Sequence, residues 1–142
     1  MMNISKNYKK IIVEELKNIA KKMKESNDPF EKMYFFSASY SCVNRIFNFE
    51  FDPTLIFTHM VLQNAYNAIR GRIELLARGQ DTLIKIPTNF YNILQETIVD
   101  IADNIDKNNK SELFENLQKI ANLSYLTTGN GYYLFQKGIL RI

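Results

Sequence analysis

The fold of this protein is decided by residues 52–78, which read DPTLIFTHMVLQNAYNAIRGRIELLAR. Asp52-Pro53 is a helix start signal, because Asp accepts hydrogen bonds from free backbone N–H groups and Pro suits the first helical position. Gly79 is typical of a helix end. Between them, apolar side chains recur at alternating spacings of four and three, which predicts the longest helix of the chain. Its apolar stripe comprises Leu55, His59, Leu62, Tyr66, Ile69, Ile73 and Leu76.

Similar periodicities predict four more helices, two before this one in the sequence and two after it. They cover residues 4–25, about 28–47, 87–105 and about 109–124. We expect Pro87 to open the fourth helix and either Asn109 or Ser111 to cap the fifth. The sequence therefore predicts an all-α fold, in which residues 1–142 form one domain. This domain is a helical bundle of about five main helices, followed by a short C-terminal helix or an apolar tail.

The composition narrows the class of protein. The chain has 142 residues with five Gly and three Pro, too few for an all-β fold with many tight turns. The single Cys42 excludes an internal disulfide and a Cys-rich zinc site, and we expect it to be a small buried side chain. The N-terminus lacks the apolar core of a signal peptide, and the longest uncharged run is too polar for a membrane span. A cytoplasmic protein without a membrane partner is the expectation.

Two segments, residues 33–44 and 53–69, carry almost no charge. We therefore expect the second helix to be central and the most buried, and the third helix to be apolar on more than one side. One small bundle would leave part of this surface uncovered, which favours a homodimer that buries it. The predicted interface residues are Tyr40, Leu55, His59, Leu62 and Tyr66.

The main alternative to a dimeric interaction subunit is a nucleic-acid-binding protein, which a basic face of the first helix indicates. Lysines line one side of the first helix, although Glu14 and Glu15 interrupt them, and arginines follow near the end of the third helix. Such groups contact nucleic-acid phosphates, so weak, non-specific and salt-dependent binding is expected. The candidate contacts are Lys9, Lys10, Lys17, Lys21, Lys24, Arg70 and Arg72.

The sequence offers no catalytic set and no cofactor or metal site. His59 is the only histidine, and we expect it to be partly buried and bonded to a backbone carbonyl or a Tyr hydroxyl, with pairing to Cys42 as the less favoured alternative. Glu96, Asp100 and Asp103 share a face of the fourth helix, but helical metal sites add a Glu-x-x-His element that this chain lacks. We interpret this acidic face as solvated, or as a surface that meets the lysines of a second copy.

Gly129-Asn130-Gly131 is the most loop-like motif of the chain. It satisfies neither the phosphate-loop pattern nor the dinucleotide-binding pattern. Two interpretations remain, an anion-binding nest of backbone N–H groups and, preferably, a helix end where a glycine takes a left-handed conformation.

These patterns favour a non-enzymatic interaction or assembly subunit that is homo-oligomeric and has a possible further protein partner. The alternative is a small basic subunit of a nucleoprotein complex, which would contact the nucleic-acid backbone through its first helix.

Overall fold

The computed structural model describes residues 4–47, 49–79, 86, 88–125 and 127. This part of the chain forms five α-helices and no strand, so the predicted all-α fold is confirmed. The helices are α1 (Lys6–Glu25), α2 (Pro29–Ile46), α3 (Pro53–Ala77), α4 (Phe90–Asp106) and α5 (Lys110–Tyr125).

Side-chain caps explain where four of the helices begin. In α1 the hydroxyl oxygen of Ser5 accepts a hydrogen bond from the N–H of Tyr8 at 3.4 Å. The carboxylate of Asp28 accepts a hydrogen bond from the N–H of Phe30 at 3.1 Å, and that of Asp52 accepts one from the N–H of Leu55 at 3.0 Å. For α5, Asn109 and not Ser111 is the cap, since its side-chain oxygen accepts from the N–H of Glu112 at 3.2 Å.

The predicted start of the fourth helix at Pro87 is wrong. Helix α4 begins at Phe90, and Asn89 occupies the N-cap position without a side-chain hydrogen bond. Residues 88 and 89 form a turn before the first helical residue. Proline is compatible with a turn as well as with a first helical turn, so it did not mark the boundary by itself.

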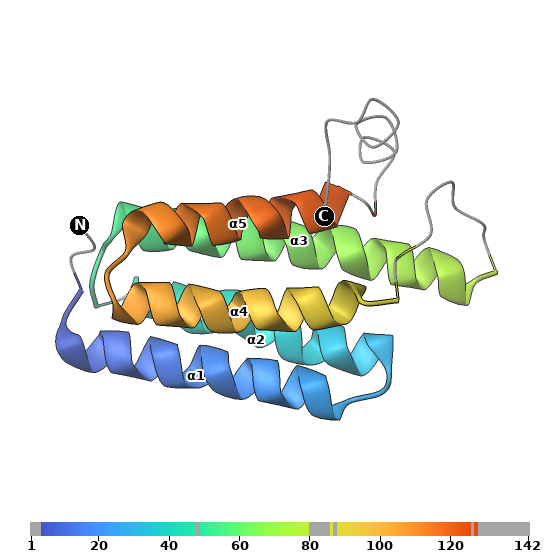
Figure 1. Ribbon diagram of the computed structural model, residues 1–142, viewed down its shortest axis with the longest axis horizontal. Coiled ribbons are helices and arrows are strands. Elements are labelled where there is room, and N and C mark those ends of the chain that lie inside the picture. Colours follow the sequence, from blue (N-terminus) through green and yellow to red (C-terminus); the bar gives the residue numbers. More distant parts are fainter. Residues whose placement is uncertain (1–3, 48, 80–85, 87, 126, 128–142) are drawn as a thin grey trace.

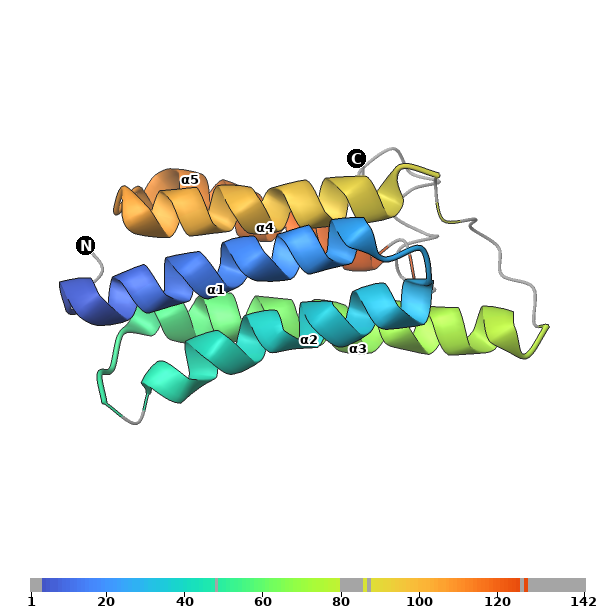
Figure 2. The ribbon, with the colours of Figure 1, turned by 90° about the horizontal axis from the view of Figure 1, so that it is seen from below.

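The five helices form a ring around one core. Figures 1 and 2 show them side by side, and their main contacts give the order α1, α2, α3, α5, α4 and back to α1. The core is a single cluster that draws side chains from all five helices, including the fully buried Leu16, Phe36, Leu62, Ile98 and Leu117. Each such side chain contributes about 1.5–3 kcal/mol through burial of apolar surface. Among the described helices, none is both long and apolar enough to cross a membrane.

The expectation that the second helix is central is wrong, because the ring has no central helix. Helix α2 makes its main contacts with α1 and α3 alone. Its outer side carries uncharged residues that face solvent, with Tyr34 at 69% exposure and Ala38 and Ser41 also exposed. The lack of charge in residues 33–44 does not imply burial, because small and aromatic residues also occupy exposed positions.

Helix α3 buries a stripe that differs from the predicted one. Its large members Leu55, Leu62 and Ile69 are fully buried as expected, but His59 and Tyr66 are only half-buried. The residue before each of them in the sequence faces the core instead. These are Thr58, whose hydroxyl donates to the Thr54 carbonyl at 2.8 Å, and Ala65. Small side chains allow the neighbouring helices to approach α3 closely.

The C-terminal end of α3 extends past its neighbours. Both ribbon views show this end projecting beyond α2 and α4 (Figures 1 and 2). Leu76, which was predicted to belong to the stripe, is 46% exposed as a consequence, whereas Ile73 one turn earlier is buried.

Candidate functional site

An apolar groove lies between α3 and α5. It has a volume of about 510 Å³, and its described lining is apolar except for one glutamine. The lining residues are Phe57, Val61, Phe114, Leu117, Gln118 and Ala121.

Helical spacing brings these side chains to one face. Phe57 and Val61 lie one turn apart on α3, and Phe114, Leu117 and Ala121 follow at three- and four-residue intervals on α5. The rings of Phe57 and Phe114 meet edge to face with their centroids 5.6 Å apart. This arrangement is favourable for aromatic pairs.

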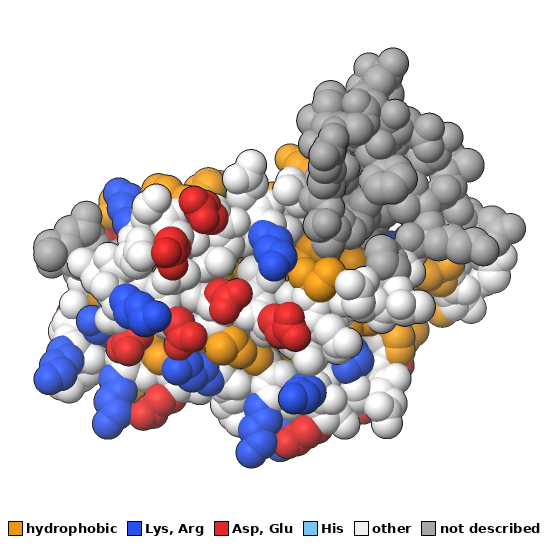
Figure 3. Space-filling model, in the orientation of Figure 1, with side chains coloured by type: hydrophobic (Ala, Val, Ile, Leu, Met, Phe, Trp, Pro, Cys, Tyr) orange, Lys and Arg blue, Asp and Glu red, His pale blue; other side chains and the backbone are white. Residues whose placement is uncertain are grey.

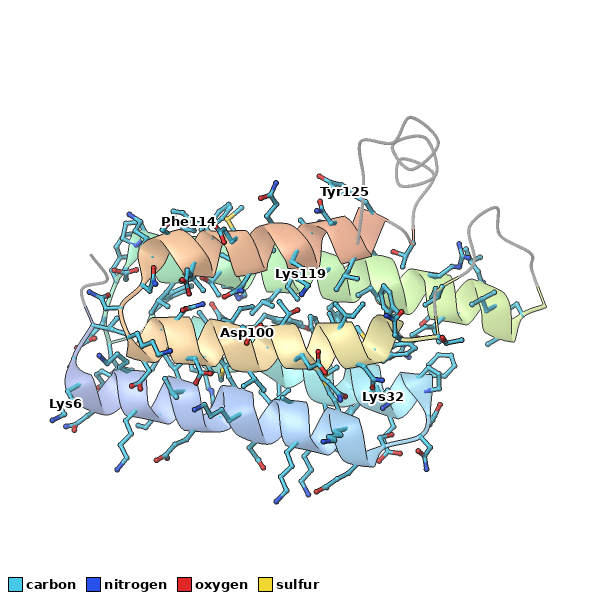
Figure 4. All side chains as sticks on the ribbon, viewed as in Figure 1. Lys6, Lys32, Asp100, Phe114, Lys119 and Tyr125 are labelled. Atoms are coloured by element: carbon cyan, nitrogen blue, oxygen red, sulfur yellow. The ribbon has the colours of Figure 1, made fainter. Side chains whose placement is uncertain are left out.

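The rim of the groove is exposed. Phe57 is 48% exposed and Phe114 39%. Figure 4 shows Phe114 on the side of α5 that points away from α4, whereas Asp100 lies on the face turned to the viewer. The ammonium group of Lys110 lies 5.6 Å from the centroid of the Phe114 ring, in a cation–π contact. The groove can therefore bury another apolar surface, and it offers almost no charge to a ligand.

The predicted interface residues divide into two groups. Leu55 and Leu62 have no exposed surface, because they belong to the core of the chain itself. A second copy cannot contact them unless the bundle opens, so this part of the predicted interface needs correction.

Tyr40, His59 and Tyr66 form a half-buried aromatic cluster between α2 and α3. The ring of Tyr40 lies 5.9 Å from that of His59 and 5.6 Å from that of Tyr66. His59 Nδ1 also lies 3.1 Å from the backbone oxygen of Tyr40. A partly buried histidine bonded to a carbonyl was expected, and this is confirmed.

Cys42 is buried, as expected, and its thiol donates to the Ser39 carbonyl at 3.3 Å. Burial raises its pKa to about 12, and the negative charge of Glu15 on α1 acts in the same direction. No hydrogen bond joins this thiol to His59, which contacts Tyr40 and Phe47. The structure therefore does not bring the two together as a reactive pair.

The predicted nucleic-acid contacts do not form a continuous basic track. Four of them have partners within the chain: Lys9 with the carbonyl of Asp106, Lys10 with Glu14, Lys17 with Asp103 and Arg70 with Glu74. Arg72 is only 5% exposed, which lowers its pKa, so it does not lie at the surface as predicted. Figure 3 shows basic and acidic side chains interspersed on the face that α1, α4 and α5 form.

One carboxylate of the acidic face of α4, that of Asp103, pairs with a lysine of the same chain. Lys17 Nζ lies 2.9 Å from Asp103 Oδ1, and this contact raises the pKa of Lys17. Because α1 and α4 are neighbours in the ring, no second copy is needed to bring these charges together. Among the described residues, no group of three or more His, Cys, Asp or Glu side chains is placed to hold a metal ion.

Three of the predicted lysines do come together in a second groove, between α1 and α4. Lys17, Lys21 and Lys24 line it from α1, and its volume is about 420 Å³. The motif Gly129-Asn130-Gly131 lies outside the described residues.

Sequence reasoning missed two elements of these grooves. The sequence did not distinguish Phe114 from its buried neighbour Leu113 on α5, although Phe114 lies off the buried stripe. Gln95 of α4 was not singled out, because a lone glutamine on a helix is ordinary in a sequence. The sequence did contain a signal for the apolar groove that Phe114 lines. Phe57 and Val61 are apolar, lie one turn apart and fall outside the predicted stripe of α3.

No protein-family model matches this sequence, and no curated protein or solved structure is significantly similar to it. The function is therefore argued from the geometry of the two grooves.

Proposed function

We propose that this protein is a non-enzymatic helical interaction subunit that self-associates through the groove between α3 and α5. The observation that carries the proposal is the exposed apolar pair of Phe57 and Phe114 at an apolar groove. Side chains of this type, partly exposed around a concave apolar surface, are typical of protein interfaces.

A second copy is the occupant that this surface suits best. The rim supplies protruding apolar side chains and the groove beside it supplies an apolar cavity, so the face is complementary to itself. A two-fold rotation can place the rim of each copy in the groove of the other. The α3 segment 53–69 contains no acidic or basic residue apart from His59, so the α3 side of this contact adds no charge repulsion between two copies. On the α5 side, the Lys110 ammonium lies 5.6 Å from the centroid of Phe114.

The proposed interface keeps α3 from the sequence-based prediction and replaces α2 by α5. Helix α2 presents Tyr34 at 69% exposure, but no residue of α2 lines the α3–α5 groove. The nucleic-acid alternative stays a prediction, and of its candidate lysines Lys21 and Lys24 have neither an ion pair nor a hydrogen bond in the described part of the chain.

The test is the mass of the protein in solution, measured by sedimentation equilibrium at micromolar concentration. We expect a species of twice 16.6 kDa, and we expect Phe57→Ser combined with Phe114→Ser to shift it to the monomer. Tyr34→Ser is the matched control, since it removes a more exposed aromatic ring from α2. A monomeric unmodified protein would overturn the proposal, and loss of the dimer in the Tyr34→Ser variant would place the interface at α2 instead.

A further inference from the structure

The apolar face that lines the α3–α5 groove continues to the end of α5. Phe114, Ala121 and Tyr125 follow one another on one side of this helix, and Figure 4 shows Phe114 and Tyr125 on it. Tyr125 is 40% exposed and is the last residue of α5. At a rise of about 1.5 Å per residue, Tyr125 lies about 6 Å along the axis from Ala121 and about 17 Å from Phe114. A segment that follows α5 and turns back along it therefore passes over the groove.

The sequence after α5 has the apolar pattern that such a groove accepts. Residues 128–142 lie outside the described residues, and they read TGNGYYLFQKGILRI. Apolar side chains recur there at spacings of three, four and three, which is the pattern of one helix face. They are Tyr132, Phe135, Ile139 and Ile142. The two charged side chains, Lys137 and Arg141, fall on the opposite face of such a helix. The stripe is therefore apolar and uncharged, as the lining of the groove is.

The length of this segment fits the groove. Residues 126–131 connect α5 to Tyr132, and six residues span up to about 20 Å, more than the roughly 8–10 Å between the axes of packed helices. Gly129 and Gly131 permit the chain to reverse, because glycine readily adopts left-handed backbone conformations. As a helix, residues 132–142 extend about 16 Å, which is close to the distance from Tyr125 back to Phe114.

We propose that residues 132–142 dock as a helix in the α3–α5 groove of their own chain and compete there with a second copy. This inference rests on the proposed function, because it names what regulates self-association at the same groove. Docking within one chain is independent of protein concentration, whereas self-association is not. The segment therefore covers Phe57 and Phe114 in dilute protein, and a second copy displaces it as the concentration rises.

The composition of the segment suits reversible docking. A helix of this length is marginal in water by itself, so its formation depends on contact with the groove. Gly138 lowers its helical stability further. The short connection to α5 raises the effective concentration of the segment to about the millimolar range, so a weak contact is sufficient to occupy the groove.

Two variants of the full chain test the competition, with sedimentation from nanomolar to micromolar concentration as the measurement. Phe135→Ser removes a ring from the apolar stripe, and Tyr133→Ser, the matched control, removes a ring from outside it. We expect Phe135→Ser to strengthen dimerisation about tenfold, because the segment no longer competes, and Tyr133→Ser to change it less than about twofold. Unchanged or weaker dimerisation of Phe135→Ser, or an equal effect of the control, would overturn the inference and leave the proposed function standing.

A disulfide locates the segment whether or not the protein dimerises. Gln118→Cys places a thiol in the groove and Ile139→Cys places one on the stripe, while the native Cys42 is buried. Upon mild oxidation of dilute protein, we expect these two positions to be bridged within one chain of 16.6 kDa. The control combines Ile139→Cys with Lys22→Cys on α1, and we expect it to be bridged about tenfold less. Equal bridging of both pairs, or a bridge between two chains, would overturn the inference. A bridge within one chain that stays monomeric at every concentration would overturn the proposed function alone.

Discussion

The two grooves of the bundle are similar in size and opposite in chemistry. The α3–α5 groove holds about 510 Å³ and has a single polar side chain in its described lining, whereas the α1–α4 groove holds about 420 Å³ and has lysines, amides and a carboxylate. Both form where neighbouring helices of one ring leave a furrow between them. The residues at the outer edge of each helix pair, and not the fold, therefore decide what each furrow can bind.

The difference also separates two physical driving forces. Association at the α3–α5 groove would gain free energy by removing apolar surface from water. Binding at the α1–α4 groove would depend on charge. The predictions below test whether the two grooves behave as independent surfaces on one stable core.

The largest effect is expected at Cys42, which lies in neither groove. Its pKa is about 12 in place of 9.0, so at pH 8 its thiolate fraction, and with it the alkylation rate, should be about a thousandfold lower in the folded than in the unfolded protein. Iodoacetamide labelling followed by mass spectrometry measures this ratio. The Phe57→Ser and Lys24→Gln variants should label as slowly as the unmodified protein, and faster labelling would mean that a groove substitution opens the bundle.

The same pKa shift predicts how stability depends on alkaline pH. The folded protein retains the Cys42 proton that the unfolded chain releases above about pH 9. Because the folded state then binds more protons, this group's stabilisation is complete below pH 9 and decreases as the pH rises towards 12. Urea unfolding of Cys42→Ala beside the unmodified protein isolates the contribution, since the variant lacks it.

The next effect separates the floor of the apolar groove from its rim. Leu117 is 1% exposed, and Leu117→Ala should lower the free energy of unfolding by about 2–5 kcal/mol through the cavity that it leaves. Phe57 is 48% exposed, and Phe57→Ser should change this free energy by less than about 1 kcal/mol. Urea unfolding at a concentration where the protein is monomeric measures both. Equal losses would show that the rim supports the fold and is not free for a partner.

A smaller effect of opposite sign is expected at Gln95. Gln95→Met removes a buried acceptor that has no donor, so it should stabilise the protein by about 1 kcal/mol. Thermal unfolding measures this gain. A loss of stability would instead indicate that the side-chain amide is already satisfied in solution.

The smallest effect concerns salt. An increase from about 0.05 M to about 0.5 M sodium chloride should change dimer affinity by less than about twofold, since apolar contacts carry no charge to screen. Sedimentation at both salt concentrations provides the comparison. A dimer that dissociates in high salt would contradict the assignment of association to the apolar groove.

The sequence by itself determined the helices. Asp28-Pro29 and Asp52-Pro53 mark helix starts through local hydrogen bonds, and these signals depend only on residues within the same turn. The buried positions of α4, Phe90, Leu94, Ile98, Ile101 and Ile105, follow equally from helical spacing, and all are fully buried. Local chemistry and periodicity were sufficient because neither requires knowledge of the neighbours of a helix.

Only the tertiary structure decided which helices are neighbours and therefore which faces remain open. The sequence placed α2 at the centre, whereas the ring has no central helix: α2 packs between α1 and α3, and the ring also pairs α3 with α5 and α1 with α4. The stripe of α3 changed for the same reason: the close approach of adjacent helices favours Thr58 and Ala65 at the core and moves His59 and Tyr66 to its edge. Contacts between residues distant in sequence depend on helix packing, and a 3.6-residue period does not specify the partner of each face.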